Sequence, residues 1–240
     1  MIRLDKLLAH NGYGTRKEVK KLIRLGFVKV DHIIIKDDDF KLDETKSIVS
    51  VNDEIVNHQD KLYLMMNKPQ DYVCANHDEI HATVFDLIAD YNVNKLFCVG
   101  RLDIDTTGLL LITNDGDFAH NITKPKKQIK KTYYAKLMGQ IDVSAFILLE
   151  KGVIIDGGLQ CLPAIVELIE QCVDYAIVKL IIEEGKFHQV KRMFKAINME
   201  VIELKRTKIG NLELDNRLEL GEYRLLEDSE VKKIFETSYL

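Results

Sequence analysis

Two carboxylates, Asp103 and Asp105, stand in a short polar loop that also contains Arg101 and two threonines. Three chemistries fit such a loop. It can be a tight turn whose Asp and Thr side chains hydrogen-bond their own backbone. It can bind calcium, because Asp103, Asp105 and Gly108 have the spacing of positions one, three and six of an EF-hand loop. It can also present a catalytic carboxylate to a substrate.

The calcium interpretation is disfavoured by the rest of the motif. Position twelve of an EF-hand is a bidentate Glu, and Asn114 stands there in this chain. The flanks are short continuous apolar runs at 96–99 and 109–112, which are typical of buried strands rather than helices. A carboxylate between two core strands is held rigidly and can still face a cleft.

The side chains of the loop are expected to alternate if the extended backbone continues into it. Leu102 would then point inward, and Arg101 and Asp103 would share a face. Asn114-Asp115-Gly116 is a turn signal that ends the second apolar run.

The string GRLDIDTTGLLLITNDG, residues 100–116, resembles the signature of the RsuA-like family of bacterial rRNA pseudouridine synthases. The match is ungapped and rich in polar residues that packing alone does not require. The resemblance implies that Asp103 is the catalytic residue. It also implies an α+β fold, in which the catalytic domain has a mixed, mainly antiparallel sheet flanked by helices.

Two later segments extend the resemblance to the active site. Lys131-Thr132-Tyr133 resembles the family's Lys-x-Tyr, whose Tyr enters the site. The segment from Glu183 to Met193 resembles the family's E-G-x-x-H-Q-V-K/R-R-M, although acids before bases also suit a helix N-terminus. By resemblance, Lys191 pairs with Asp103, Val190 packs near the target base, and His188 favours the small-subunit branch. Arg101 is expected to hold an RNA phosphate or to brace the loop.

The first sixty residues resemble the S4 RNA-binding domain. A leucine-faced helix at 3–11 precedes a capping box, Thr15 with Glu18, and a basic helix that ends at Gly26. A hairpin turning at Asp31-His32 follows, where the family usually has Asn-Gly. The basic residues predicted to contact RNA are Arg16, Lys17, Lys20, Lys21 and Arg24 in this helix, and Lys68, Lys130, His188 and Arg192 further along.

The order of elements predicts two domains, 1–60 and 61–240, joined through the polar segment 57–60. Further strands are predicted at 27–30, 33–35, 48–51, 63–66, 130–137, 164–170 and 175–182, and a helix at 142–151.

The composition is that of a globular protein, with 46% hydrophobic and 30% charged residues and a net charge of −4. The negative sum argues mildly against nucleic-acid binding, but the basic residues cluster near the N-terminus and at 124–131. No apolar run is as long as a membrane span, and the N-terminus lacks the features of a secretion signal. We therefore expect a cytoplasmic protein without membrane contact.

The four cysteines show no C-x-x-C pairing, so a disulfide framework is not expected. Cys74, His77, His81 and Cys98 could be considered as zinc ligands, but their spacing is irregular and the family has no metal there. We expect no metal site.

Taken together, the resemblance implies isomerisation of a specific uridine in small-subunit (16S) rRNA, free or within an assembly particle. Pseudouridine formation has no redox step, so no cofactor is expected. Two roles are open for the carboxylate at the ribose from the sequence alone, that of a nucleophile and that of a general base. The alternatives are a synthase acting on large-subunit (23S) rRNA and a non-catalytic S4-type RNA-binding protein. A monomer is favoured.

Overall fold

The computed structural model describes residues 1–11, 13–44, 46–56 and 61–236. These residues form two compact units. Unit 1 is Met1–Leu62 with Asn92–Leu96 and Asn114–Gly116, and unit 2 is Tyr63–Tyr91, Phe97–Thr113 and Asp117–Leu240. The predicted linker, 57–60, lies outside the described residues, and the boundary after residue 60 stays a prediction.

Unit 1 is built on two helices, α1 (Leu4–His10) and α2 (Arg16–Arg24). The capping box is present as predicted, because Thr15 N–H donates to Glu18 Oε2 over 2.7 Å while Thr15 Oγ1 accepts from Glu18 N–H. The leucines of α1 pack against Val19 and Ile23 of α2, and all of these are buried. The short strands of unit 1 are β1 (Ile2–Arg3), β2 (Val28–Val30), β3 (Ile33–Ile34), β4 (Lys41–Leu42), β5 (Val49–Val51) and β6 (Glu54–Ile55).

The hairpin between β2 and β3 turns at the predicted dipeptide. Asp31 and His32 have φ angles of 49° and 69°, the positive values that a two-residue I′ turn requires. Strands β3, β2, β5 and β6 then lie in that order in one antiparallel sheet.

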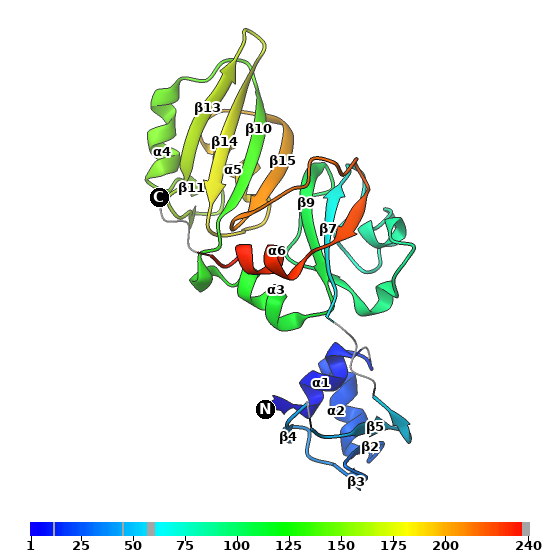
Figure 1. Cartoon of the computed structure of the whole chain (residues 1–240). Coiled ribbons are helices and arrows are strands. Elements are labelled where there is room, and N and C mark those ends of the chain that lie inside the picture. The colour runs from blue at the N-terminus through cyan, green and yellow to red at the C-terminus, as the bar shows by residue number, and fades with distance from the viewer. Residues whose placement is uncertain (12, 45, 57–60, 237–240) are drawn as a thin grey trace. The chain divides into compact units, whose positions relative to one another are not determined.

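Unit 2 is organised around one mixed sheet (Figure 1). Its strands lie in the order β13-β14-β10-β15-β9-β7-β17, and only the β9–β15 pair is parallel. The strands of this sheet are β7 (Tyr63–Lys68), β8 (Phe97–Cys98), β9 (Thr106–Thr113), β10 (Lys131–Met138), β13 (Ile165–Gln171), β14 (Tyr175–Ile182), β15 (Val201–Ile209), β16 (Leu212–Glu213) and β17 (Tyr223–Leu225), where β8 pairs with β9 and β16 with β15. A separate two-stranded sheet is formed by β11 (Ile154–Ile155) and β12 (Leu159–Gln160). The α+β class and the mainly antiparallel sheet are therefore confirmed.

The helices of unit 2 are short. They are α3 (Gly116–Thr123), α4 (Phe146–Glu150), α5 (Gln189–Ala196) and α6 (Asp228–Lys233), with 3-10 turns η1 (Val84–Leu87), η2 (Val93–Lys95), η3 (Pro125–Lys127) and η4 (Val143–Ala145), η2 belonging to unit 1. α3 and α6 lie together against β9 and β7 (Figure 1), where Phe118, Ile122 and Ile234 join the core. The side chains of Leu109–Ile112 have no exposure, so both faces of β9 are covered and the continuous apolar run is explained.

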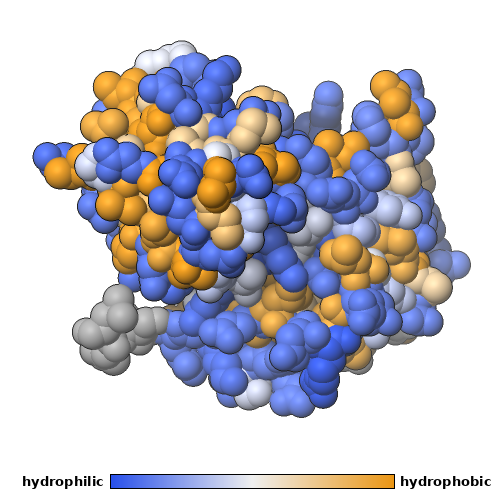
Figure 2. Space-filling model, turned by 90° about the horizontal axis from the view of Figure 1, so that it is seen from above, coloured by the Kyte–Doolittle hydropathy of each residue, from blue (hydrophilic) through white to orange (hydrophobic). Residues whose placement is uncertain are grey.

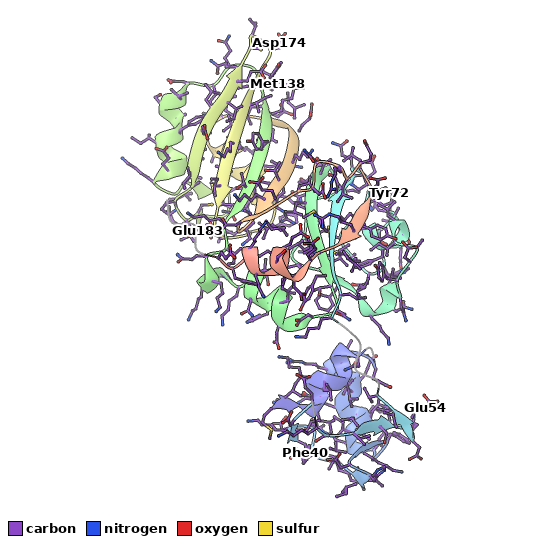
Figure 3. The ribbon with its side chains drawn as sticks, in the orientation of Figure 1. Phe40, Glu54, Tyr72, Met138, Asp174 and Glu183 are labelled. Carbon is purple, nitrogen blue, oxygen red and sulfur yellow. The ribbon has the colours of Figure 1, made fainter. Side chains whose placement is uncertain are left out.

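The neighbouring strands β10 and β14 have one end away from the α5 segment and one end next to it. Met138 and Asp174 lie at one end of the β10–β14 pair, and Glu183 lies at the other, where the chain leaves β14 (Figure 3). The acids at 183 and 184 stand in a loop ahead of α5, which begins only at Gln189. The alternative of a helix N-terminus at Glu183 is thus not what the chain adopts.

Exposed apolar side chains gather over α4 and strands β11 to β13, at the left of the view from above (Figure 2). They include Ile147, Leu148, Ile154, Leu159, Ile165 and Ile169. None of the helices in the described part of the chain is long and apolar enough to cross a bilayer.

Candidate active site

A cleft of about 520 Å³ opens in unit 2 beside the loop that joins β8 to β9. It brings together side chains from the loop, from β10 and β15, and from the segment before and within α5. Five of the predicted site residues line it: Arg101, Asp103, Tyr133, His188 and Val190.

The loop is fastened from behind by Lys68, the last residue of β7. Its ammonium donates to the carbonyl oxygens of Pro69 (2.8 Å), Ile104 (3.2 Å) and Thr106 (3.0 Å). The side chain is fully buried, and burial lowers the pKa of the Lys68 amine. Lys68 was predicted to bind RNA, and this is wrong for the described structure, because an amine with no exposure and three carbonyl partners cannot reach a phosphate.

Further backbone contacts fix the turn around Asp103. Thr106 N–H donates to the Asp103 carbonyl over 3.1 Å, and Asp71 N–H donates to the Ile104 carbonyl over 3.0 Å. Leu102 N–H donates to Cys74 Sγ over 3.4 Å. Leu102 is buried and Arg101 is exposed, as expected, although residues 99–105 form no regular strand.

Asp103 has a side chain that is 26% exposed, so its carboxylate lies at the mouth of the cleft rather than in the core. His188 Nε2 lies 3.6 Å from Asp103 Oδ1. His188 precedes α5 with a positive φ of 48°, and its ring stacks on Phe187 at 3.7 Å between centroids.

Lys191 does not pair with Asp103 as the resemblance implied. Its ammonium contacts both carboxylate oxygens of Asp105, two residues further along the same loop. Burial acts to raise the pKa of Asp105, but the hydrogen bond and charge of Lys191 outweigh it and hold that pKa below its usual value. The predicted pairing is therefore corrected: the partner of Lys191 is Asp105, whose side chain is 59% exposed, and not Asp103, whose side chain is 26% exposed.

The floor of the cleft is the face of the central sheet. Tyr133 of β10 is buried there, beside Lys131 of the same strand and Arg206 of β15. Arg206 Nε donates to the Leu109 carbonyl over 2.8 Å. Burial and the neighbouring Arg206 charge lower the pKa of Lys131 to about 8.

The remaining basic residues predicted to bind RNA fall into different surroundings. The Arg192 guanidinium forms an ion pair with the Asp156 carboxylate and donates a hydrogen bond to the Asp156 backbone carbonyl. It also donates to the Phe187 carbonyl over 3.0 Å. Lys130 is partly exposed next to the cleft floor. In unit 1, Arg16, Lys17 and Lys21 are exposed, whereas Asp38 engages Lys20 at 3.3 Å and Arg24 at 2.8 Å.

The sulfur atoms near the loop have structural partners. Cys74 accepts a hydrogen bond from Cys98, which together with its other contacts lowers the pKa of Cys74 to about 7 and raises that of Cys98. Among residues that the structure describes, no three His, Cys, Asp or Glu side chains converge in a metal-binding cluster.

Sequence reasoning missed Thr106, Lys131 and Arg206, all of which line the cleft. A signal for two of them exists. In β10 and β15 the inward positions alternate with outward ones, so Lys131 shares a face with Tyr133, and Arg206 shares one with Leu204. A charged residue at an inward position of an alternating strand marks a candidate site.

A carboxylate loop over a sheet floor that carries a tyrosine and two basic residues defines a site with the groups of an acid–base or nucleophilic enzyme. Residues 62–196 match the family model described as RNA pseudouridylate synthase, and residues 2–48 match the S4 domain. The chain belongs to the RNA pseudouridylate synthase family and carries an N-terminal S4 domain. Both resemblances drawn from the sequence are confirmed.

Similar proteins cover nearly the whole chain. An uncharacterised RNA pseudouridine synthase of Bacillus subtilis is 44% identical over 96% of this chain and 97% of its own. Ribosomal small subunit pseudouridine synthase A of Vibrio cholerae is 42% identical over 98% of this chain and 100% of its own. The crystal structure of a pseudouridylate synthase matches with a TM-score of 0.71 and 37% identity, covering 98% of this chain and 100% of that one.

Proposed function

We propose that this protein converts a specific uridine of small-subunit (16S) rRNA to pseudouridine, with Asp103 as the catalytic carboxylate. The observation that carries the proposal is the position of Asp103, at the mouth of a cleft whose floor holds Tyr133. The protein acts in the cytoplasm as a monomer, on rRNA that is free or within an assembly particle.

The reaction breaks the N1–C1′ bond of uridine, turns the uracil, and forms a C5–C1′ bond. N1 gains a proton and C5 loses one, so atoms balance without any electron transfer. The carboxylate of Asp103 acts at the ribose, which the mouth of the cleft would hold, while the base lies deeper. Tyr133 and Val190 flank the base from β10 and α5.

The target base must leave its stack to enter the cleft. Flipping a base costs a few kcal/mol, and less where the RNA is unpaired. Contacts to the RNA backbone offset this cost. The exposed basic side chains of α2 supply positive charge for these contacts, and they are Arg16, Lys17 and Lys21. Within unit 2, Arg101 at the cleft mouth and Lys130 beside its floor are placed to contact the flanking phosphates.

The choice of the small subunit rests on relatives. Ribosomal small subunit pseudouridine synthase A of Vibrio cholerae aligns over its full length with this chain. His188, which stands in the cleft 3.6 Å from Asp103, is the residue type that the resemblance ties to this branch.

The test is to map pseudouridine by carbodiimide-dependent reverse-transcription stops on both rRNAs, from cells with and without the gene. A stop in 16S rRNA that disappears on deletion is the expected result. Loss of a stop in 23S rRNA instead would contradict the assignment to the small subunit. If no stop disappears in either rRNA, the assignment of the protein as a pseudouridine synthase of rRNA is contradicted.

A matched pair of variants tests the role of Asp103. Asp103→Asn is expected to abolish conversion and to keep RNA affinity. Asp105→Asn removes the same charge from the same loop, at a carboxylate that Lys191 occupies, and is expected to retain conversion within about tenfold. Conversion by Asp103→Asn at the rate of the wild type would overturn the assignment.

A further inference from the structure

Two residues that line the cleft each have a buried polar atom with no hydrogen-bond partner. Among the described residues, only three buried side-chain atoms lack one: Asn67 Oδ1, Thr106 Oγ1 and Arg206 Nη2. Thr106 and Arg206 both line the cleft, and they are 1% and 4% exposed. Native proteins rarely leave such groups unpaired, so two of them lining one cleft indicate a polar ligand that pairs with them.

The sheet fixes both groups rigidly. β9 and β15 run parallel, with Thr106 opposite Leu204 and Gly108 opposite Arg206. Arg206 Nε is held by the Leu109 carbonyl, which orients the guanidinium and leaves Nη2 free of any partner. Groups on adjacent core strands hold a ligand more precisely than groups on loops.

We propose that Arg206 Nη2 and Thr106 Oγ1 bind the polar edge of the target uracil, and that Arg206 makes the cleft specific for uracil over cytosine. This inference rests on the proposed function. Arg206 donates to a ring carbonyl, because a guanidinium has donors only, and Thr106 accepts from N3–H.

The chemistry of the turn suits this arrangement. Turning uracil about the line through N3 and C6 exchanges N1 with C5 and the C2 carbonyl with the C4 carbonyl. N3–H stays on the axis. A donor placed away from the ribose therefore meets a carbonyl oxygen both before and after the turn, and an acceptor at N3–H is never displaced.

The same contacts stabilise charge and exclude cytosine. When the N1–C1′ bond breaks, negative charge spreads from N1 to the two carbonyl oxygens, and a buried cation stabilises it strongly. Lys131, on the same cleft floor, adds a second positive group. Cytosine presents an amino group at C4, which would face the Arg206 guanidinium donor to donor, whereas the Thr106 hydroxyl can turn and donate to the bare N3 of cytosine.

A phosphate is the weaker interpretation of these groups. Leu102, Val190 and Leu204 line the same cleft and are buried. Apolar walls with a few fixed polar atoms are typical of a pocket for a planar base.

Thr106→Val tests the proposal without the ambiguity of a destabilised fold. Valine has the shape of threonine and lacks the unpaired hydroxyl, so the thermal midpoint should stay the same or rise. The single-turnover rate of pseudouridine formation should fall about tenfold with unchanged RNA affinity. Thr106→Ser keeps the hydroxyl and should restore most of the rate. A wild-type rate for Thr106→Val, or an equal loss for Thr106→Ser, would overturn the role of this hydroxyl.

A second measurement does not depend on catalysis. Uridine and cytidine 5′-monophosphates share ribose and phosphate, so NMR titration with each compares the bases alone. Wild type should bind the uridine nucleotide at least about tenfold more tightly. Arg206→Lys keeps the charge but has no second arm to reach the base while the first contacts the Leu109 carbonyl, and it should lose the preference. Thr106→Val should weaken the binding of both nucleotides.

The outcomes separate the two proposals. Equal binding of both nucleotides by the wild type, or a preference kept by Arg206→Lys, would overturn the uracil pocket even if rRNA is modified. An absence of pseudouridine formation on either rRNA, with the preference present, would overturn the proposed function and leave the pocket.

Discussion

Lys191 forms its ion pair with Asp105 and not with Asp103, although both carboxylates belong to one loop. The Lys191 amine extends from α5 to the loop and neutralises Asp105, the more exposed of the two carboxylates. The imidazole of His188 lies 3.6 Å from the carboxylate of Asp103.

A double-mutant cycle between Lys191→Gln and Asp105→Asn should measure this pairing. Because Asp105 is 59% exposed, we expect a coupling in unfolding free energy of about 0.3–1 kcal/mol that shrinks in high salt. The same cycle with Asp103→Asn is the control and should give a smaller coupling. A larger coupling to Asp103 would mean that the pairing of the family resemblance prevails in solution.

Lys68→Met should destabilise the protein, because it leaves the carbonyls of Pro69, Ile104 and Thr106 without their shared donor. We expect a loss of about 2–4 kcal/mol and a fall in the melting temperature of about 5–15 °C. Lys130→Met, at a partly exposed site, should change it little. Equal melting temperatures for the two variants would show that the buried amine does not fasten the loop.

Lys131 should make stability depend on pH above neutrality. Its pKa is lowered to about 8 in the folded state, chiefly by burial, against about 10.4 in an unfolded chain. Between these values the unfolded chain binds the extra proton, so the contribution of Lys131 to unfolding free energy rises with pH. Lys131→Met should therefore be more stable than wild type at pH 7, by a margin that narrows by pH 10, in urea unfolding. A margin independent of pH would contradict the lowered pKa.

Gly108→Ala should disrupt the contact between β9 and β15. Gly108 has a φ of +99°, and an added Cβ would lie 2.2 Å from the Arg206 carbonyl oxygen. We expect a loss of about 3 kcal/mol or more. Gly157→Ala is the control, since its φ is +80° but nothing lies within 4 Å, and it should cost about 1 kcal/mol. Similar unfolding midpoints for the two variants would show that the strands can separate at no cost.

Asp38→Asn should strengthen RNA binding by releasing Arg24 of α2 and by removing the nearest of the three carboxylates around Lys20, which keeps Asp5 at 3.9 Å and Asp39 at 3.8 Å. Each released cation that reaches a phosphate steepens the slope of log affinity against log salt by about 0.7 for single-stranded RNA. Filter binding over a range of salt concentrations measures this slope. Asp37→Asn removes the same charge from the same loop, and an equal effect there would mean that only net charge matters.

Local signals in the chain were sufficient for many elements. The capping box at Thr15, the hairpin turn at Asp31-His32 and the paired strands β13 and β14 follow from short-range rules and are present as predicted. The long polar match around Asp103 identified the family, because catalysis fixes residue types that packing leaves open.

The partners of charged groups could not be predicted in this way. Lys68 follows an apolar strand and looks like a surface base, and only the fold shows it buried beneath the loop. Arg206 reaches the Leu109 carbonyl across 97 positions in the chain, through the single parallel strand pair.

By itself the sequence determined many of the strands and helices, the family, and the carboxylate that stands at the centre of the proposed chemistry, but it did not reveal β15, which carries Arg206. Only the tertiary structure decided which cation meets which carboxylate, and that Thr106 and Arg206 face the same cleft unpaired. The physical reason is that periodicity and capping act over a few residues, whereas ion pairs and buried hydrogen bonds depend on strand order and register. Those are set when distant segments pack into one sheet.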